Sequence, residues 1–224
     1  MLKRICSTLK KKYWEQVFAH SRKIFCIGRN KTGTTSMAKL FLDLGYHVAP
    51  QRPGDLLLKN WVNNEFGEII KFSRYGGQVF QDIPFSLPET YKHLDKAFPG
   101  SKFILTIRDS PEIWYDSVIR SQSKLFGHGK IPTRQDLMTA IYTYPGYMWE
   151  VNQLIYHTPE NDPYNKEILI GHYLKHNADV MDYFGNKSAQ LLVLNLKEAD
   201  AGKKIADFIG SKRIIHEVPW ENKT

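Results

Sequence analysis

The chain has 224 residues, of which 42% are hydrophobic and 24% are charged. These proportions are typical of one globular domain with its own core, and they exclude a fibrous or intrinsically disordered protein. The net charge of +8 favours anionic partners, such as nucleotides, acidic glycans, nucleic acid or a membrane surface, without choosing among them. The two cysteines, Cys6 and Cys26, are too few for a disulfide framework or a cysteine metal site, so we expect a reducing, cytoplasmic environment.

Residues 1–22 form a basic segment whose apolar side chains recur at helical spacing. Those side chains are Leu2, Ile5, Leu9, Tyr13, Trp14 and Phe18. We expect an amphipathic helix that packs on the domain that follows, and peripheral contact with a membrane is the alternative. The segment has neither the uninterrupted apolar run nor the small-residue cleavage site of a signal peptide, and no stretch of the chain approaches the length of a membrane span.

From residue 23 onward, short apolar patterns typical of strands alternate with helical patterns. The expected strands cover 23–27, 78–82, 102–107 and 191–196. The expected helices cover 37–44, 88–98, 111–125, 168–184 and 201–209. This alternation predicts one α/β domain over 23–224, with three αβα layers around a mainly parallel sheet of about four to five strands, as in the P-loop NTPases.

Residues 126–164 interrupt this alternation with an irregular pattern rich in Gly, Pro, His, Tyr and Trp. We interpret the segment as a partly helical lid on the acceptor side of the active face. Its aromatic rings suit stacking on a sugar or a phenol, and they suit the packing of the lid itself equally well.

The first expected strand leads directly into a loop with two glycines, Gly28 and Gly33, and then into a helix. The backbone N–H groups of such a loop and the positive end of the helix dipole make an anion site. The glycine spacing is that of the P-loop, G-x-x-x-x-G-K followed by S or T, but Thr34 occupies the lysine position and the lysine lies at Lys31. The displacement disfavours a triphosphate–magnesium site. A nucleotide or small-molecule kinase with a degenerate P-loop remains an alternative function, and so does a non-catalytic module that binds nucleic acid or anionic glycan.

The segment 31–36, with the sequence KTGTTS, resembles the 5′-phosphosulfate loop of sulfotransferases that use 3′-phosphoadenosine 5′-phosphosulfate (PAPS), K-x-G-T-T followed by S or W. The resemblance implies that this loop binds the donor and that Lys31 stabilises the bridging oxygen as the sulfuryl group leaves. The donor contacts are expected at Arg29, Asn30, Lys31, Thr32, Gly33, Thr34, Thr35 and Ser36. It also implies adenosine 3′,5′-bisphosphate (PAP) as the second product and no metal requirement.

A second segment, 106–117, resembles the 3′-phosphate segment of the same family, a strand ending in R-D-x-x-x-x-W-Y-x-S. Arg108 at the strand end is suited to bind phosphate oxygens with its guanidinium, and Ser117 lies about two turns into the next helix. The spacing from arginine to serine is nine here and eight in much of the family, so Ser110 remains a second candidate contact. Three later segments, 173–184, 191–195 and 218–222, resemble the end of the P-loop-type sulfotransferases found in bacteria. The resemblance implies sulfuryl transfer to a hydroxyl or amine of a glycan or small molecule.

Sulfuryl transfer to a hydroxyl usually needs a general base. Asp82, at the end of the second expected strand, is a candidate for that base or for an anchor of the acceptor. Beside Lys31 its pKa should be low, which would make it a weak base unless burial outweighs the pairing; its structural alternative is to hold Lys31 or to cap the following turn. His176 is a second candidate as base or orienting residue, and a packed histidine is the other interpretation. Expected strands are followed directly by the two-glycine loop, by Asp82 and by Arg108. In a parallel sheet the carboxyl ends of the strands form one edge, and ligands bind at that edge.

Overall fold

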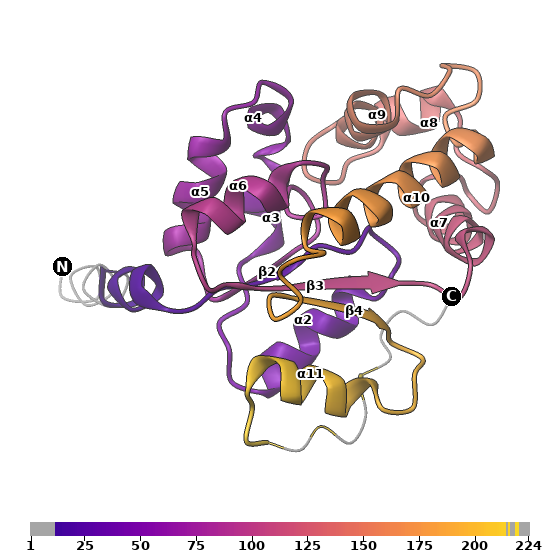
Figure 1. The fold of residues 1–224 in the computed structure, drawn as a ribbon. Helices are drawn as coiled ribbons and strands as arrows, with labels where there is room; N and C mark the ends of the chain where they lie inside the picture. The colour runs from indigo at the N-terminus through magenta and orange to yellow at the C-terminus, as the bar shows by residue number, and fades with distance from the viewer. Residues whose placement is uncertain (1–11, 214, 216–217, 220–224) are drawn as a thin grey trace.

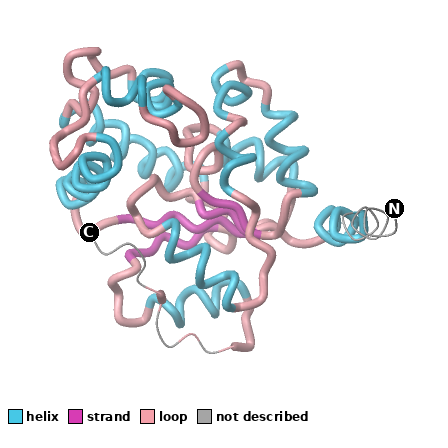
Figure 2. Tube along the Cα trace, turned by 180° about the vertical axis from the view of Figure 1, so that it is seen from behind, coloured by secondary structure: helices cyan, strands magenta, loops and turns pink. Residues whose placement is uncertain are grey.

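The computed structural model describes residues 12–213, 215 and 218–219. Within them, four parallel strands form one sheet in the order β2-β1-β3-β4. The strands are β1 Ile24–Cys26, β2 Val79–Gln81, β3 Lys102–Ile107 and β4 Leu191–Asn195. Helices cover both faces of this sheet, which confirms the three-layer α/β fold (Figures 1 and 2).

Five helices fall where the sequence predicts them. They are α2 Thr34–Asp43, α6 Thr90–Ala97, α7 Pro111–Phe126, α10 Lys166–Tyr183 and α11 Ala201–Ile209. The start of α7 shows why such a position is predictable: Ser110 Oγ accepts a hydrogen bond from Ile113 N at 3.2 Å, and Pro111 takes the first helical position.

Two separate cores lie above and below the sheet. Successive side chains of a strand point to opposite faces, so Phe25 belongs to one core and Cys26, a buried free thiol, to the other. The core of Phe25 lies under α5 (Phe66–Tyr75), α6 and α10, and the core of Cys26 lies against α2 and α11 (Figure 1). Burial on both faces explains why the strands are apolar throughout.

The segment between α2 and β2 contains three helices, although the sequence predicts no element there. They are α3 Gln51–Asp55, α4 Leu58–Val62 and α5. The first two have five residues each, too short to establish a helical period, and α3 includes Pro53 and Gly54, both poor helix formers. These helices matter for function because α3 reaches the site.

The segment 126–164 is partly helical, as predicted. It contains α8 Arg134–Thr139, α9 Tyr147–Val151 and the π-helix η1 Asn152–Tyr156. Its buried side chains pack with those of α7 and α10 in a third core, which includes Trp114, Tyr147 and Leu169. The lid is therefore fixed to the domain by its own apolar contacts.

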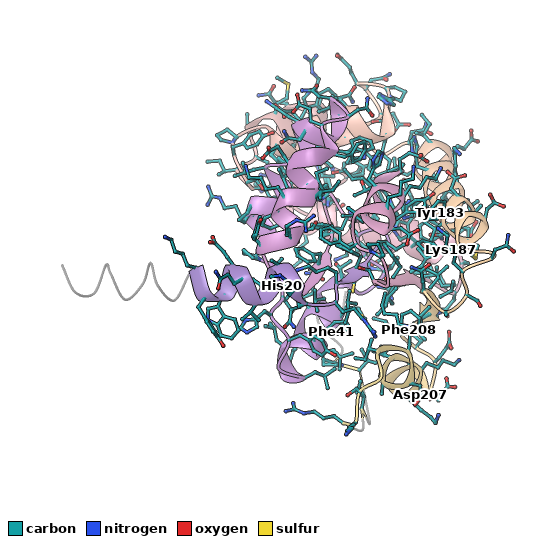
Figure 3. All side chains as sticks on the ribbon, turned by 60° about the vertical axis from the view of Figure 1, so that its left-hand side comes forward. His20, Phe41, Tyr183, Lys187, Asp207 and Phe208 are labelled. Carbon is teal, nitrogen blue, oxygen red and sulfur yellow. The ribbon has the colours of Figure 1, made fainter. Side chains whose placement is uncertain are left out.

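Residues 12–20 are helical, and Figure 3 shows them leading into the domain near the labelled His20. The rings of Trp14 and Phe18 lie 4.1 and 5.1 Å from the ring of His47. Lys23 Nζ donates hydrogen bonds to the carbonyl oxygens of Phe18 and Gly77 at 2.6 and 2.9 Å. This part of the segment thus contacts the domain. The predicted apolar positions before residue 12 lie outside the described residues, and the domain division after residue 22 stays a prediction. Within the described chain, no helix is long and apolar enough to cross a membrane.

Candidate active site

A cavity of about 380 Å³ opens beyond the carboxyl ends of β1, β2 and β3. The structure brings most of the sequence-predicted site residues to its wall. These are Asn30, Lys31, Gly33, Thr34, Thr35, Ser36, Asp82 and Arg108. Side chains from α7 and from the lid complete the wall, so loop, sheet edge and lid share one site.

The loop after β1 owes its shape to its two glycines. A Cβ on Gly28 would lie 2.2 Å from Thr106 Oγ1, so only glycine permits the loop to cross β3 this closely. Gly33 has a φ of 111° and precedes the first turn of α2, whose residues line the cavity. Thr32 lies behind the loop, where its hydroxyl donates to the Arg29 carbonyl oxygen at 2.6 Å. The positive end of the α2 dipole therefore borders the cavity, which favours an anion there.

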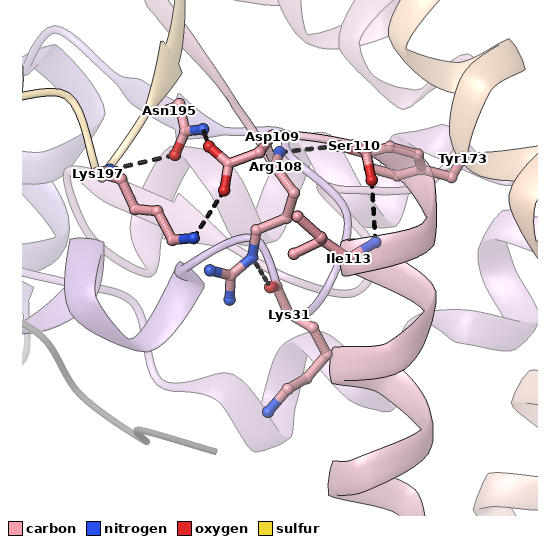
Figure 4. A network of polar contacts seen from close by, with 8 residues as sticks. All are labelled: Lys31, Arg108, Asp109, Ser110, Ile113, Tyr173, Asn195 and Lys197. Carbon is pink, nitrogen blue, oxygen red and sulfur yellow. Dashed lines mark hydrogen bonds and ion pairs between the residues drawn. The ribbon is translucent and has the colours of Figure 1, made fainter.

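Two donors from the segment that follows β3 hold neighbouring carbonyl groups of this loop. Arg108 Nε donates to the Lys31 carbonyl oxygen at 2.7 Å (Figure 4), and Trp114 Nε1 donates to the Asn30 carbonyl oxygen at 2.8 Å. Lys31 itself has a φ of 65°. The two phosphate-type segments of the sequence are thus joined by direct hydrogen bonds.

The cations of the site lower one another's proton affinity. Burial and then the charge of Arg108 lower the pKa of Lys31, and Arg120 lowers it further, while Asp82 acts in the opposite direction. An anionic ligand would compensate this accumulation of positive charge.

Neither predicted serine lies on the cavity wall. Ser110 caps α7, and Ser117 is buried, with 2% of its surface exposed. Ser121, one turn further along α7, does line the cavity, and the resemblance to the family segment does not identify it.

Asp109, next to Arg108, turns toward the end of β4, where its carboxylate accepts from Asn195 Nδ2 and pairs with Lys197 Nζ, both at 2.6 Å (Figure 4).

Arg29 and His176 also lie away from the cavity wall. Arg29 is buried, donates to the Ser86 carbonyl oxygen at 3.0 Å and stacks over the ring of Tyr156. His176 Nε2 lies 2.8 Å from the carbonyl oxygen of Ile27, directly before the loop. Burial and then the charge of Arg29 lower the pKa of His176 to about 3, so the ring is neutral and Nε2 donates to this carbonyl. This environment favours the interpretation of His176 as a packed histidine that supports the loop.

The pKa of Asp82 is higher than its place beside Lys31 predicts from the sequence. Burial and then the neighbouring Asp55 raise its pKa to about 6, although the Ile83 N–H, Arg29 and Lys31 each act to lower it. Burial thus outweighs the pairing with Lys31, which is the exception that the sequence left open. A pKa of about 6 leaves Asp82 mostly ionised at pH 7 and able to accept a proton.

Asp55 could not be identified from the sequence, because the sequence predicts no helix at α3. Asp55 lines the cavity, and its carboxylate accepts from Gln51 Nε2 at 2.7 Å and from Thr143 Oγ1 at 2.9 Å. Tyr142 and Tyr147 of the aromatic lid also line the cavity. This part of the cavity wall therefore combines two carboxylates with aromatic rings.

A parallel sheet with a two-glycine loop and charged side chains at its carboxyl edge defines an α/β fold whose ligand site lies at that edge. A family model described as a sulfotransferase domain matches residues 23–224. The chain belongs to this sulfotransferase family, whose reaction is sulfuryl transfer. No curated protein matches the chain.

Proposed function

We propose that the protein is a cytoplasmic PAPS-dependent sulfotransferase that transfers a sulfuryl group to a hydroxyl or amine. The hydrogen bond between Arg108 Nε and the Lys31 carbonyl oxygen carries the proposal, because it couples two cationic anion-binding segments at one cavity. Two such segments suit a donor with two separate anionic groups. A kinase is less well supported, since Thr34 replaces the P-loop lysine.

The residues present fit this donor. Asn30 Oδ1 is buried without a hydrogen-bond partner among the described residues, and Asn30 lines the cavity. Lys31, Arg108 and the first turn of α2 would hold the anionic groups. The donor, when bound, supplies a sulfuryl group activated by its bond to the 5′-phosphate.

The residues divide the reaction between them. Lys31 neutralises the charge that develops on the leaving 5′-phosphate oxygen when the S–O bond to it breaks and its electron pair moves to that oxygen. Asp82 takes the proton of the acceptor as the new O–S or N–S bond forms, and later releases it to solvent. The products are a sulfated acceptor and PAP. No step requires a metal.

The acceptor side supports a hydroxyl-bearing glycan or small molecule. Tyr142, Tyr147 and Met148 line this part of the cavity and offer flat or flexible apolar surface. A screen of sugars, phenols and amino alcohols with radiolabelled donor would identify the acceptor.

Donor binding tests the proposal without knowledge of the acceptor. We expect calorimetry to detect PAP binding in the absence of magnesium. Lys31→Ala should weaken it about 10- to 100-fold, as expected for one charge-assisted hydrogen bond. Lys39→Ala is the matched control in α2, the helix that follows the loop, since Lys39 is exposed and pairs with Asp43, and it should leave binding unchanged. Tight ATP–magnesium binding without PAP binding would overturn the proposal in favour of a kinase.

The base has its own test. Asp82→Asn should lower turnover about 100- to 10,000-fold while the dissociation constant for PAP stays within about threefold. PAP binding without transfer by the wild-type chain to any acceptor in the screen would favour the non-catalytic module. Normal turnover of the asparagine variant would remove Asp82 from the mechanism.

A further inference from the structure

Helix α3 brings a second carboxylate, Asp55, to the cavity that Asp82 lines. Both oxygens of Asp55 accept a hydrogen bond, Oδ1 from Gln51 Nε2 and Oδ2 from Thr143 Oγ1, at 2.7 and 2.9 Å. Only 5% of the residue is exposed. Burial raises the pKa of Asp55, and the hydrogen bonds from Gln51 and Thr143 act against this rise because they stabilise the charged form of the carboxylate.

The same helix is anchored to the segment that follows Asp82. Gln51 Nε2 lies 3.3 Å from the carbonyl oxygen of Ile83. A Cβ on Gly54 would lie 2.8 Å from this oxygen, so the backbone of α3 packs directly against it. Asp55 therefore has a fixed place relative to Asp82, and the contact at Gly54 does not involve the Asp55 carboxylate.

Charged and titratable groups face Asp82 from three elements. Arg29 and Lys31 come from the loop, and both lower the pKa of Asp82. Tyr142 and Tyr147 come from the lid; burial, then the charge of Asp55 and then that of Asp82 raise their pKa, so both stay neutral near pH 7. Asp55, from α3, is the negative member of the group and raises the pKa of Asp82.

Asp82 accepts fewer hydrogen bonds than Asp55 among the described residues, so its charged form is stabilised less by such bonds. The hydrogen bond that Asp82 accepts within the described chain comes from Ile83 N to Oδ1, at 3.1 Å. We propose that Asp55 is a positioning residue: its fixed negative charge makes Asp82 the carboxylate that takes the proton from the acceptor. The inference rests on the proposed role of Asp82 as base. The proton passes from the acceptor to an Asp82 oxygen as the bond to sulfur forms, and Asp55 remains ionised throughout.

Nuclear magnetic resonance of the full chain with isotope-labelled aspartate carboxyls tests the inference. The wild type should show one carboxyl that titrates near pH 6, and Asp82→Asn should remove this signal and so assign it. Asp55→Asn, which is nearly isosteric, should move the titration down by about one pH unit, as expected for loss of a nearby charge. Asp179→Asn is the control, because Asp179 is on the exposed surface of α10 and pairs with Lys175. An Asp82 titration that stays in place in Asp55→Asn would overturn the inference.

A second variant covers the possibility that Asp55→Asn does not fold. Thr143→Val removes one donor from Asp55 and keeps the shape of the side chain. Asp55 should then compete for the proton, and the single titration near pH 6 should become two coupled steps. A single unchanged step in this variant would contradict the inference.

The pH dependence of turnover separates this inference from the proposed function. The acid limb of the wild-type profile should follow Asp82, and in Asp55→Asn it should move to lower pH with a several-fold lower plateau. If Asp82→Asn keeps both turnover and acid limb, the proposed base is wrong. If turnover requires Asp82 but the pH at which Asp82 titrates is the same in the wild type and in Asp55→Asn, only the positioning role of Asp55 is wrong.

Discussion

Replacement of Gly33 by alanine tests whether the backbone shape of the loop is required. At a φ of 111° and a ψ of 25°, an L-residue is strained, which costs about 1–3 kcal/mol. The new Cβ would also lie 2.3 Å from Leu196 Cδ1, the end of a flexible side chain that can move aside at a cost of about 0.5–1 kcal/mol. Gly33→Ala should therefore lower the free energy of unfolding by about 1.5–4 kcal/mol and weaken PAP binding, because the first turn of α2 shifts.

A double-mutant cycle separates strain from contact. Leu196→Ala removes the atom that the new Cβ meets, so the double variant should be more stable than the sum of the single effects by about 0.5–1 kcal/mol. Urea unfolding followed by circular dichroism measures stability, and calorimetry measures PAP binding. The control is Gly67→Ala in α5, where nothing lies within 4 Å of the new Cβ and the change should stabilise by about 0.5–1 kcal/mol. Additive effects, or a Gly33→Ala variant as stable as this control, would refute the reasoning.

Three further predictions concern the same site. Gly28→Ala should destabilise the fold by about 2–4 kcal/mol in urea unfolding, because its Cβ would also lie 2.6 Å from the backbone oxygen of Thr106, which cannot rotate away. Asp82→Asn should stabilise the fold at pH 7 by about 1–3 kcal/mol, because a pKa raised to about 6 means that folding favours the protonated form; this gain should disappear below pH 4, and its absence at pH 7 would contradict the raised pKa. Trp114→Phe removes the donor to the Asn30 carbonyl oxygen and should weaken PAP binding about three- to tenfold in calorimetry, whereas unchanged affinity would mean that this hydrogen bond does not support the site.

Much of the fold could be predicted because its elements carry strong local signals. β3 and α11 have the bounds expected from the sequence, since a continuous apolar run defines the first and Gly210 ends the second. The helix α3 gives no such signal, because five residues with a proline and a glycine have no measurable period. What places α3 is its contact with Ile83, which is remote in sequence.

The same limit applies to the chemistry of the site. The sequence identifies Lys31, Asp82 and Arg108 as residues that follow strands, and the structure brings them to one cavity. It could not give the direction of the Asp82 pKa, because that direction depends on burial and on Asp55. Nor could it decide between the interpretations of His176, since the family pattern gives its position in the helix and not its partner, the carbonyl oxygen of Ile27.

The hydrogen bond from Arg108 Nε to the Lys31 carbonyl oxygen also bears on the thermodynamics of binding. When a loop becomes ordered only on ligand binding, the loss of its conformational entropy weakens the affinity. Here Arg108 and Trp114 already hold the carbonyl groups of Lys31 and Asn30 in the folded protein. The loop therefore loses its conformational entropy during folding, and ligand binding does not have to order it. Lysine could not replace arginine at this position, because a single ammonium group cannot hold the loop with one nitrogen and leave two others for an anion. The shape of the guanidinium, more than its charge, is what makes the loop rigid in advance.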